Sequence, residues 1–252
     1  MAQKSTLPCS IRPYKPSDKA SVVSLFRFGV LEHVYPAFFK SISHADHIGV
    51  AISICMAGYV LGGSSYFQAL LFGGAWAGLV YYCCHEIYTG YLNRKLSGEM
   101  DDVQTHFLDN PNNNFWVAEM DVNGQSKIAG VVAVLAHKGG DEPEGGRSNS
   151  WNGSVMATDE GDGSYGEVFQ LVVSFPLRRK ALGSQLLQTA IDFCKEQGLM
   201  SVVLETSSPQ AAVLALAKKM GFVQTSSHNN THSSRWMAKL ARISVLRMEK
   251  VI

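Results

Sequence analysis

The sequence of 252 residues predicts an α/β domain whose mixed central sheet is flanked by helices and interrupted near its N-terminus by an apolar helical hairpin. Two observations predict this class. Strand and helix patterns alternate from residue 167 to 222, which favours a layered α/β domain. Residues 48–84 carry no charged side chain, and this stretch is far longer than the roughly 20 residues that one membrane-spanning helix needs.

The charge balance and the cysteines exclude several classes of protein. The net charge of +1 provides no basic field for a nucleic acid, so we expect no nucleic-acid partner. The odd number of cysteines fits neither a disulfide framework nor zinc spacing, and we expect no metal. The N-terminal residues are polar and do not resemble a signal peptide. The five cysteines are Cys9, Cys55, Cys83, Cys84 and Cys194.

A strand, a basic turn and a helix form the central pattern of the chain. The apolar run at 168–173 predicts a buried strand, and the basic turn at 178–180 follows it. Residues 182–197 have apolar positions at helical spacing, and Gly198 ends this helix. The unpaired N–H groups at a helix start, together with the helix dipole and the basic side chains, favour a bound phosphate.

The segments around this pattern complete the predicted sheet. Residues 201–206 predict the next strand and residues 210–220 the next helix. Residues 115–120 and 127–136 predict two further strands, and the Asn-Gly pair at 123–124 predicts a hairpin between them.

The basic turn carries a family resemblance. Residues 178–183, Arg-Arg-Lys-Ala-Leu-Gly, resemble the Arg/Gln-x-x-Gly-x-Gly/Ala loop of the GNAT superfamily of N-acetyltransferases. That resemblance implies a loop that cradles the pyrophosphate of acetyl-CoA. Ala181 stands where the family usually has its first glycine, which brings a methyl group close to the expected phosphate.

The apolar stretch narrows the resemblance to the camello-like N-acetyltransferase 8 family, whose domain is similarly interrupted near its start. The Tyr-Leu pair at 91–92, residues 98–103 and the Phe-Trp-Val-Ala at 115–118 resemble that family, and the likeness extends from about residue 10 to 222. It implies an N-acetyltransferase in the endoplasmic reticulum membrane that moves an acetyl group from acetyl-CoA to an amine. The acceptor is an amino acid, a cysteine conjugate or a protein lysine.

The resemblance also implies the roles of individual residues. Glu167 is the candidate general base that deprotonates the amine through water. The backbone N–H groups at 171–173 polarise the thioester, and Gln210 touches the cofactor. The implied cofactor-binding residues are Leu171, Val172, Val173, Arg178, Arg179, Lys180, Ala181, Leu182, Gly183, Ser184 and Gln210.

One departure leaves a second function open. Ala217 occupies the position where the family usually has the tyrosine that protonates the departing thiolate, and alanine cannot do so. Water can protonate a thiolate whose thiol has a pKa of about 8.5. The alternative is a catalytically weak relative that binds CoA as a regulatory or scaffold membrane protein.

The apolar stretch predicts two short helices, 48–61 and 66–84, joined at a Gly-Gly-Ser-Ser turn. A hairpin returns the chain to the side of the membrane from which it entered, so the first strand and Glu167 can belong to one sheet. Lys40 and the Arg-Lys pair at 94–95 flank the stretch and favour the cytosolic side. The alternatives are a buried hairpin of a soluble protein and a dimer interface. Glycines expected to allow close helix contact are Gly58, Gly62, Gly73, Gly74 and Gly78.

The predicted organisation has four parts. Residues 10–47 hold the first strand and helix, 48–84 the membrane hairpin, and 85–224 the rest of the acetyltransferase domain with a flexible insertion at 138–165. Residues 225–252 form a final strand or an amphipathic helix. We expect contact with membrane lipid and an amine acceptor, and a homo-oligomer is an open alternative.

Overall fold

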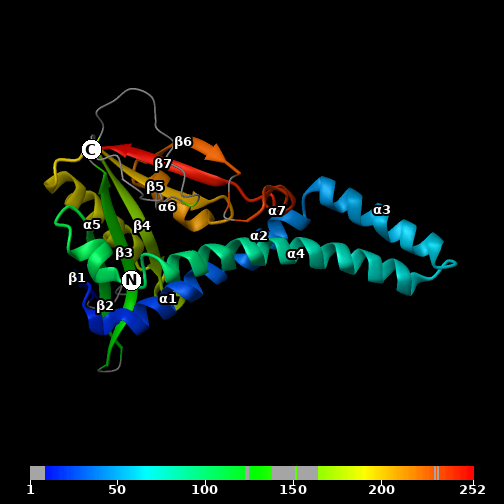
Figure 1. The fold of residues 1–252 in the computed structure, drawn as a ribbon, viewed down its shortest axis with the longest axis horizontal. Coiled ribbons are helices and arrows are strands. Elements are labelled where there is room, and N and C mark those ends of the chain that lie inside the picture. Colours follow the sequence, from blue (N-terminus) through cyan, green and yellow to red (C-terminus); the bar gives the residue numbers. More distant parts are fainter. Residues whose placement is uncertain (1–8, 123–124, 138–150, 152–163, 230, 232) are drawn as a thin grey trace, which may run out of the picture.

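The computed structural model describes residues 9–122, 125–137, 151, 164–229, 231 and 233–252 (Figure 1). A seven-stranded sheet has the order β1-β2-β3-β4-β5-β7-β6, in which β4 and β5 are parallel and the other neighbours antiparallel. The strands are β1 (Cys9–Pro13), β2 (Asn114–Val122), β3 (Gln125–His137), β4 (Tyr165–Val173), β5 (Ser201–Ser207), β6 (Val223–His228) and β7 (Val245–Val251). The predicted mixed α/β sheet flanked by helices is therefore confirmed.

Helices cover both faces of this sheet (Figure 1). One core lies between the sheet and helices α1, α2 and α4, and the other lies between the sheet and helices α5 and α6. Since side chains alternate along a strand, Phe169 of β4 faces the first core and Val168 faces the second. The helices are η1 (Pro16–Asp18), α1 (Lys19–Leu31), α2 (Val34–Ile42), α3 (Ala45–Leu61), α4 (Tyr66–Ser97), η2 (Gln104–Leu108), η3 (Phe175–Leu177), α5 (Leu182–Glu196), α6 (Ala211–Lys219) and α7 (Arg235–Ala241).

The centre of the sheet is irregular. β4 pairs with β5 only from Tyr165 to Val168, although both strands continue beyond that point. Against β3, the register shifts so that Val132 lies opposite two residues of β4, and Gln170 has a φ of 53° there. This is a β-bulge, which bends a strand locally. The bulge and the loss of pairing together leave the second half of β4 unpaired on its β5 side.

The C-terminal segment contains both structures that the sequence left as alternatives. The short helix α7 is followed by β7, which lies between β5 and β6. The insertion predicted at 138–165 falls on residues of which Trp151 and 164–165 are described, and the Asn-Gly pair at 123–124 lies outside the described residues.

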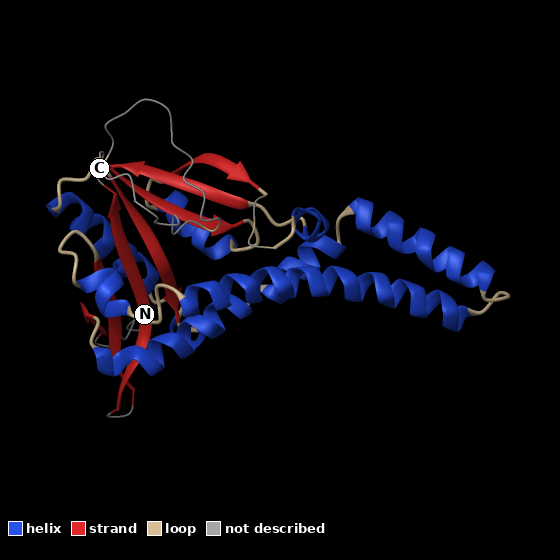
Figure 2. Ribbon diagram, in the orientation of Figure 1, coloured by secondary structure: helices blue, strands red, loops and turns tan. Residues whose placement is uncertain are grey.

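Helices α3 and α4 form an antiparallel pair that projects from the sheet domain (Figures 1 and 2). A Cβ atom on Gly73 would lie 2.4 Å from Cys55 Sγ, so this glycine does allow close contact between the helices. The same holds at Gly58, where a Cβ atom would lie 3.0 Å from a backbone oxygen of α4. The expectation was wrong for Gly74 and Gly78, since both face open space.

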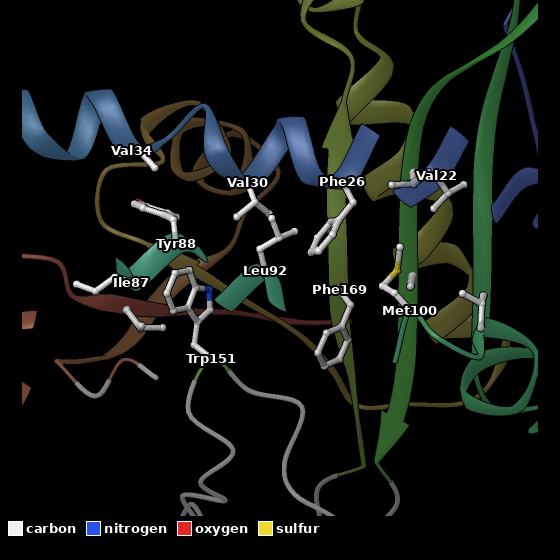
Figure 3. Close-up of a cluster of buried hydrophobic side chains, with 14 of the residues drawn as sticks. Val22, Phe26, Val30, Val34, Ile87, Tyr88, Leu92, Met100, Trp151 and Phe169 are labelled. Carbon is white, nitrogen blue, oxygen red and sulfur yellow. The ribbon is translucent and has the colours of Figure 1, made fainter. Parts of the chain in front are cut away.

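Helix α4 is much longer than predicted. It continues past residue 84 to Ser97, and its second half packs against the sheet through buried side chains that include Tyr88 and Leu92 (Figure 3). The first half behaves differently, because its apolar side chains and those of α3 are exposed. These exposed side chains include Ile52, Met56, Val60, Leu61, Tyr66, Phe67, Leu70 and Leu71.

Among the described residues, two helical segments are long and apolar enough to cross a membrane, Pro16–Ile42 and Tyr66–Ser97, and Ala45–Leu61 is a shorter apolar helix. Length and composition alone are weak evidence for a membrane span. The rest of the described chain does not bury the hairpin, however, so its apolar surface must meet either lipid or another protein surface.

Candidate functional site

A cavity of about 770 Å³ lies beside the second half of β4, where that strand has parted from β5. Residues from α1, α4, β4, β5, α6 and the turn before α5 line it. Every residue expected in the site lines this cavity except Lys180, which is exposed elsewhere on the loop. Those lining it are Glu167, Leu171, Val172, Val173, Arg178, Arg179, Ala181, Leu182, Gly183, Ser184 and Gln210.

The register of β4 directs two of its peptide groups toward the cavity. The N–H of Ser174 donates to the carbonyl of Ala129 at 2.8 Å, and Val172 is the next β4 residue that bonds toward β3. Because hydrogen-bonding directions alternate along a strand, the peptide groups of Leu171 and Val173 point the other way. There β5 no longer pairs with β4, so the N–H groups of Leu171 and Val173 are available to a ligand, whereas the N–H of Val172, expected in the same role, points toward β3.

The turn before α5 adopts a conformation that usually requires glycine. Arg179 and Ala181 both have a φ of 62°, and Ala181 is the N-cap of α5. Left-handed backbone costs a residue with a Cβ atom about 1 kcal/mol or more. The glycine-like geometry is thus present without glycine, and the first turn of α5 directs its unpaired N–H groups at the end of the cavity.

Arg178 is held on both sides. Its Nε donates to the carbonyl of Val173 at 2.9 Å, and its Nη2 lies 2.5 Å from Glu32 Oε1 at the end of α1. This arginine therefore ties the loop to β4 and to α1. Glu32 also lines the cavity, and no local sequence pattern pointed to it, because it stands at the polar end of a surface helix.

Glu167 lies at the other end of the cavity. It is only 4% exposed, and His137 Nε2 lies 3.3 Å from its Oε2. The ring of His137 stacks on Tyr165, with 4.7 Å between ring centroids. A buried carboxylate beside an imidazole is a suitable group for proton transfer.

Three residues that the sequence did not predict form the wall near Glu167. Trp151 stacks on Tyr91 with 4.3 Å between ring centroids, and its backbone N–H donates to Glu205 Oε2 at 3.1 Å. Figure 3 shows Trp151 beside the buried side chains of α1 and α4. Glu205 Oε1 also lies 3.7 Å from Arg247 Nη1. All three residues line the cavity.

Behind this wall lies a buried ion pair. Lys95 Nζ is 2.8 Å from Glu99 Oε1, and the same ammonium lies 4.8 Å from the ring centroid of Phe169. Burial raises the pKa of Glu99, against the opposing effect of Lys95. The pair fixes the end of α4 relative to β4, because a buried charge without its partner would cost several kcal/mol.

The remaining expected positions lie on β5 and α6. The hydroxyl of Thr206 donates to Gln210 Oε1 beside the cavity. Ala217 is fully buried in the core between the sheet and α5. Its methyl group offers no proton donor there. Among the described residues, no group of three or more His, Cys, Asp or Glu side chains could hold a metal ion.

The fold and this cavity define an acyltransferase domain. Residues 81–222 match the acetyltransferase (GNAT) family, and the chain belongs to that family. It is an acetyltransferase of the GNAT type, and acetyl-CoA is the acyl donor. The resemblance drawn from the basic turn is therefore confirmed.

Individual relatives are similar to this chain over more of its length than the family model covers. Human N-acetyltransferase 8 is 27% identical over 218 residues, which cover 86% of each chain. The probable N-acetyltransferase camello of Xenopus laevis is 29% identical over 221 residues, covering 84% of this chain and 85% of that one. The solved structure of Arabidopsis thaliana NAA60 in complex with a bisubstrate analogue superposes with a TM-score of 0.51. The match covers 97% of this chain and 98% of that one at 12% identity, and it shows that the fold is shared.

We expect the substitution Ala181→Gly to raise the free energy of unfolding by about 0.5–1 kcal/mol, because it relieves the left-handed strain at φ 62°. Urea unfolding of the purified protein measures this. Ala190→Gly, in the buried middle of the same helix, is the control and should lower the free energy of unfolding by at least about 1 kcal/mol. If both variants were less stable than the wild-type protein, the backbone of Ala181 would not be strained.

Proposed function

We propose that the protein transfers an acetyl group from acetyl-CoA to an amine within the cavity between β4 and β5, while α3 and α4 anchor it in a membrane. The observation that carries the proposal is one continuous cavity that joins the first turn of α5 to Glu167 along the unpaired edge of β4. Such a cavity accommodates an elongated cofactor with its reactive end at the carboxylate.

The cofactor occupies the half of the cavity nearest α5. The N–H groups of the first turn of α5, with Arg178 and Arg179, hold the pyrophosphate. The N–H groups of Leu171 and Val173 bond the pantetheine arm and polarise the thioester carbonyl, whose oxygen gains negative charge during attack.

Glu167 acts in the other half. An amine arrives as an ammonium ion near neutral pH and must lose a proton before its nitrogen can attack the thioester. Glu167 accepts that proton through a water molecule, and its burial shields the exchange from bulk solvent.

The charges near Glu167 favour one class of acceptor. The wall there carries two carboxylates, Glu167 and Glu205, and the rings of Tyr91 and Trp151. Burial lowers the pKa of His33, which lines the same region and is therefore uncharged near neutral pH. Among the described residues that line this end, no free cation is present to pair with a carboxylate beside the acceptor's amine. An amine on an uncharged chain, such as a protein lysine, fits better than an amino acid or a cysteine conjugate.

A panel of acceptors tests this function. We expect steady release of CoA with a lysine-containing peptide and a slower rate with free amino acids or cysteine conjugates of equal amine basicity. A preference for acceptors that carry a carboxylate next to the amine would contradict the charge argument.

A specific observation favours a second function. The position from which a tyrosine would protonate the departing thiolate holds the buried Ala217. A protein that binds CoA without efficient turnover, and acts as a regulatory or scaffold component, would tolerate this alanine. Tight binding of acetyl-CoA with no CoA release across the whole panel would support this function.

Changing Arg178 and Arg179 together to Glu should weaken CoA binding by well over tenfold, since charged hydrogen bonds to phosphate contribute roughly 1.5–3 kcal/mol each. Titration calorimetry measures the dissociation constant. Glu32→Gln is the control, because it breaks the ion pair with Arg178 but keeps both arginines. Unchanged CoA affinity in the double variant would place the phosphate site elsewhere.

The proton transfers can be tested by a pH–rate profile. Glu167→Gln should lower the rate mainly below the pKa of the amine, where proton removal by the enzyme is needed. Full activity of the Gln variant over this pH range would remove Glu167 from the mechanism.

The hairpin supports membrane anchoring through its exposed apolar side chains. With 17 residues, α3 is at the lower limit for a full span, so either a re-entrant hairpin or two full spans is compatible with it. Lys40 and Arg94 flank the apolar stretch, and positive flanks face the cytosol. We propose the endoplasmic reticulum membrane, with the catalytic domain facing the cytosol.

Two N-glycosylation sequences, at 152–154 and 229–231, allow this membrane topology to be tested. Residues 152–154 and 230 lie outside the described part of the chain, and Asn229 is exposed. Because the glycosyltransferase acts in the lumen, expression with microsomes should leave both sites unmodified. A mobility shift that a glycosidase removes would place the sheet in the lumen. Release of the protein by carbonate would instead favour a soluble protein whose hairpin is a dimer interface.

A further inference from the structure

Gln170 combines two unfavourable features in one residue. It is only 6% exposed, yet neither Oε1 nor Nε2 of its side chain has a hydrogen-bond partner among the residues that the structure describes. Its backbone also has a φ of 53°, in the left-handed region. An unsatisfied buried amide and a strained backbone are each costly, and strained residues cluster at functional sites.

The position of Gln170 relates both features to the cavity. The residue lies in the bulge of β4, opposite Val132, just after the pairing with β5 has ended. It lines the cavity three residues beyond Glu167 and immediately before Leu171. It is therefore placed where the thioester and the amine must meet if the proposed function holds.

A purely structural role does not explain this side chain. Buried glutamines in protein interiors normally bond to backbone groups or to other side chains, and this one bonds to none of the described residues. The neighbouring positions along β4, Phe169 and Leu171, are apolar and pack on either side of the sheet. A leucine at position 170 would fill similar space without leaving two polar atoms unsatisfied.

We propose that Gln170 binds a secondary amide of the bound substrate, with its Oε1 accepting from the amide N–H and its Nε2 donating to the amide carbonyl. Both polar atoms lack partners among the described residues, so the two hydrogen bonds can form whichever way the side-chain amide is turned. This inference rests on the proposed function. Two sources offer that chemistry, the amides in the pantetheine arm of acetyl-CoA and the peptide amides of a protein acceptor.

The substitution Gln170→Leu separates a binding role from a structural one. In the ligand-free protein, it removes two unsatisfied polar atoms, so the melting temperature should stay equal or rise. In the complex it removes two hydrogen bonds to the substrate, so affinity should fall on the order of fivefold to thirtyfold. A structural glutamine would instead lower the melting temperature together with the affinity.

Two measurements distinguish the sources of the amide. A weaker dissociation constant for acetyl-CoA, measured by calorimetry, assigns Gln170 to the pantetheine arm. An unchanged dissociation constant with a raised KM for a lysine peptide, at saturating acetyl-CoA, assigns it to the acceptor. Gln185→Leu, on the exposed face of α5, is the control and should change neither constant.

The outcomes also separate failure of this inference from failure of the proposed function. Wild-type protein that binds acetyl-CoA and turns over, beside a Gln170→Leu variant with the same constants, would overturn the inference alone. So would a fall in melting temperature that accompanies the loss of affinity. Wild-type protein that neither binds acetyl-CoA nor acetylates any amine would overturn the proposed function and the inference with it.

Discussion

The end of the parallel pairing between β4 and β5 is the constraint on which the site depends. Up to Val168 and Leu204 the two strands share a ladder, and beyond that point β4 has a neighbour only on its β3 side. Burying unpaired peptide groups is unfavourable, so a sheet keeps such a gap only where a ligand or water completes the bonding. The gap leaves space for the cavity and turns Leu171 and Val173 toward it. The bulge at Gln170 lies at the same point and bends β4 locally.

Helix α4 connects this site to the hairpin without a break. Its 32 residues would span about 48 Å at the usual helical rise, with exposed apolar side chains at one end and Tyr91 in the cavity wall at the other. The buried pair of Lys95 and Glu99 fixes the last turn of α4 beneath Phe169. The end of α4 that lines the cavity is therefore fixed by packing against the sheet, whereas the end in the hairpin contacts α3 and leaves its apolar side chains exposed.

Local patterns in the sequence predicted most strands, the loop before α5 and the turn between α3 and α4, because each depends on neighbouring residues. Contacts between distant segments gave no such signal. Arg178 and Glu32 are 146 positions apart, and Trp151 reaches Tyr91 from within an insertion. The length of α4 was underestimated for another reason: its side chains change from apolar to polar near residue 85, whereas its backbone hydrogen bonding continues unchanged to Ser97.

The loop before α5 keeps a glycine-like backbone at a position where alanine stands in place of glycine. Two residues with Cβ atoms, Arg179 and Ala181, adopt left-handed backbone at a combined cost of roughly 2 kcal/mol. The contacts of Arg178 with Val173 and Glu32 lie directly beside these residues and hold the loop against β4 and α1. A partly buried charged hydrogen bond contributes an amount similar to this cost. The conformation is thus maintained by tertiary contacts rather than by backbone freedom, and for that reason a comparison of loop sequences alone would not reveal that this chain keeps the shape of the loop.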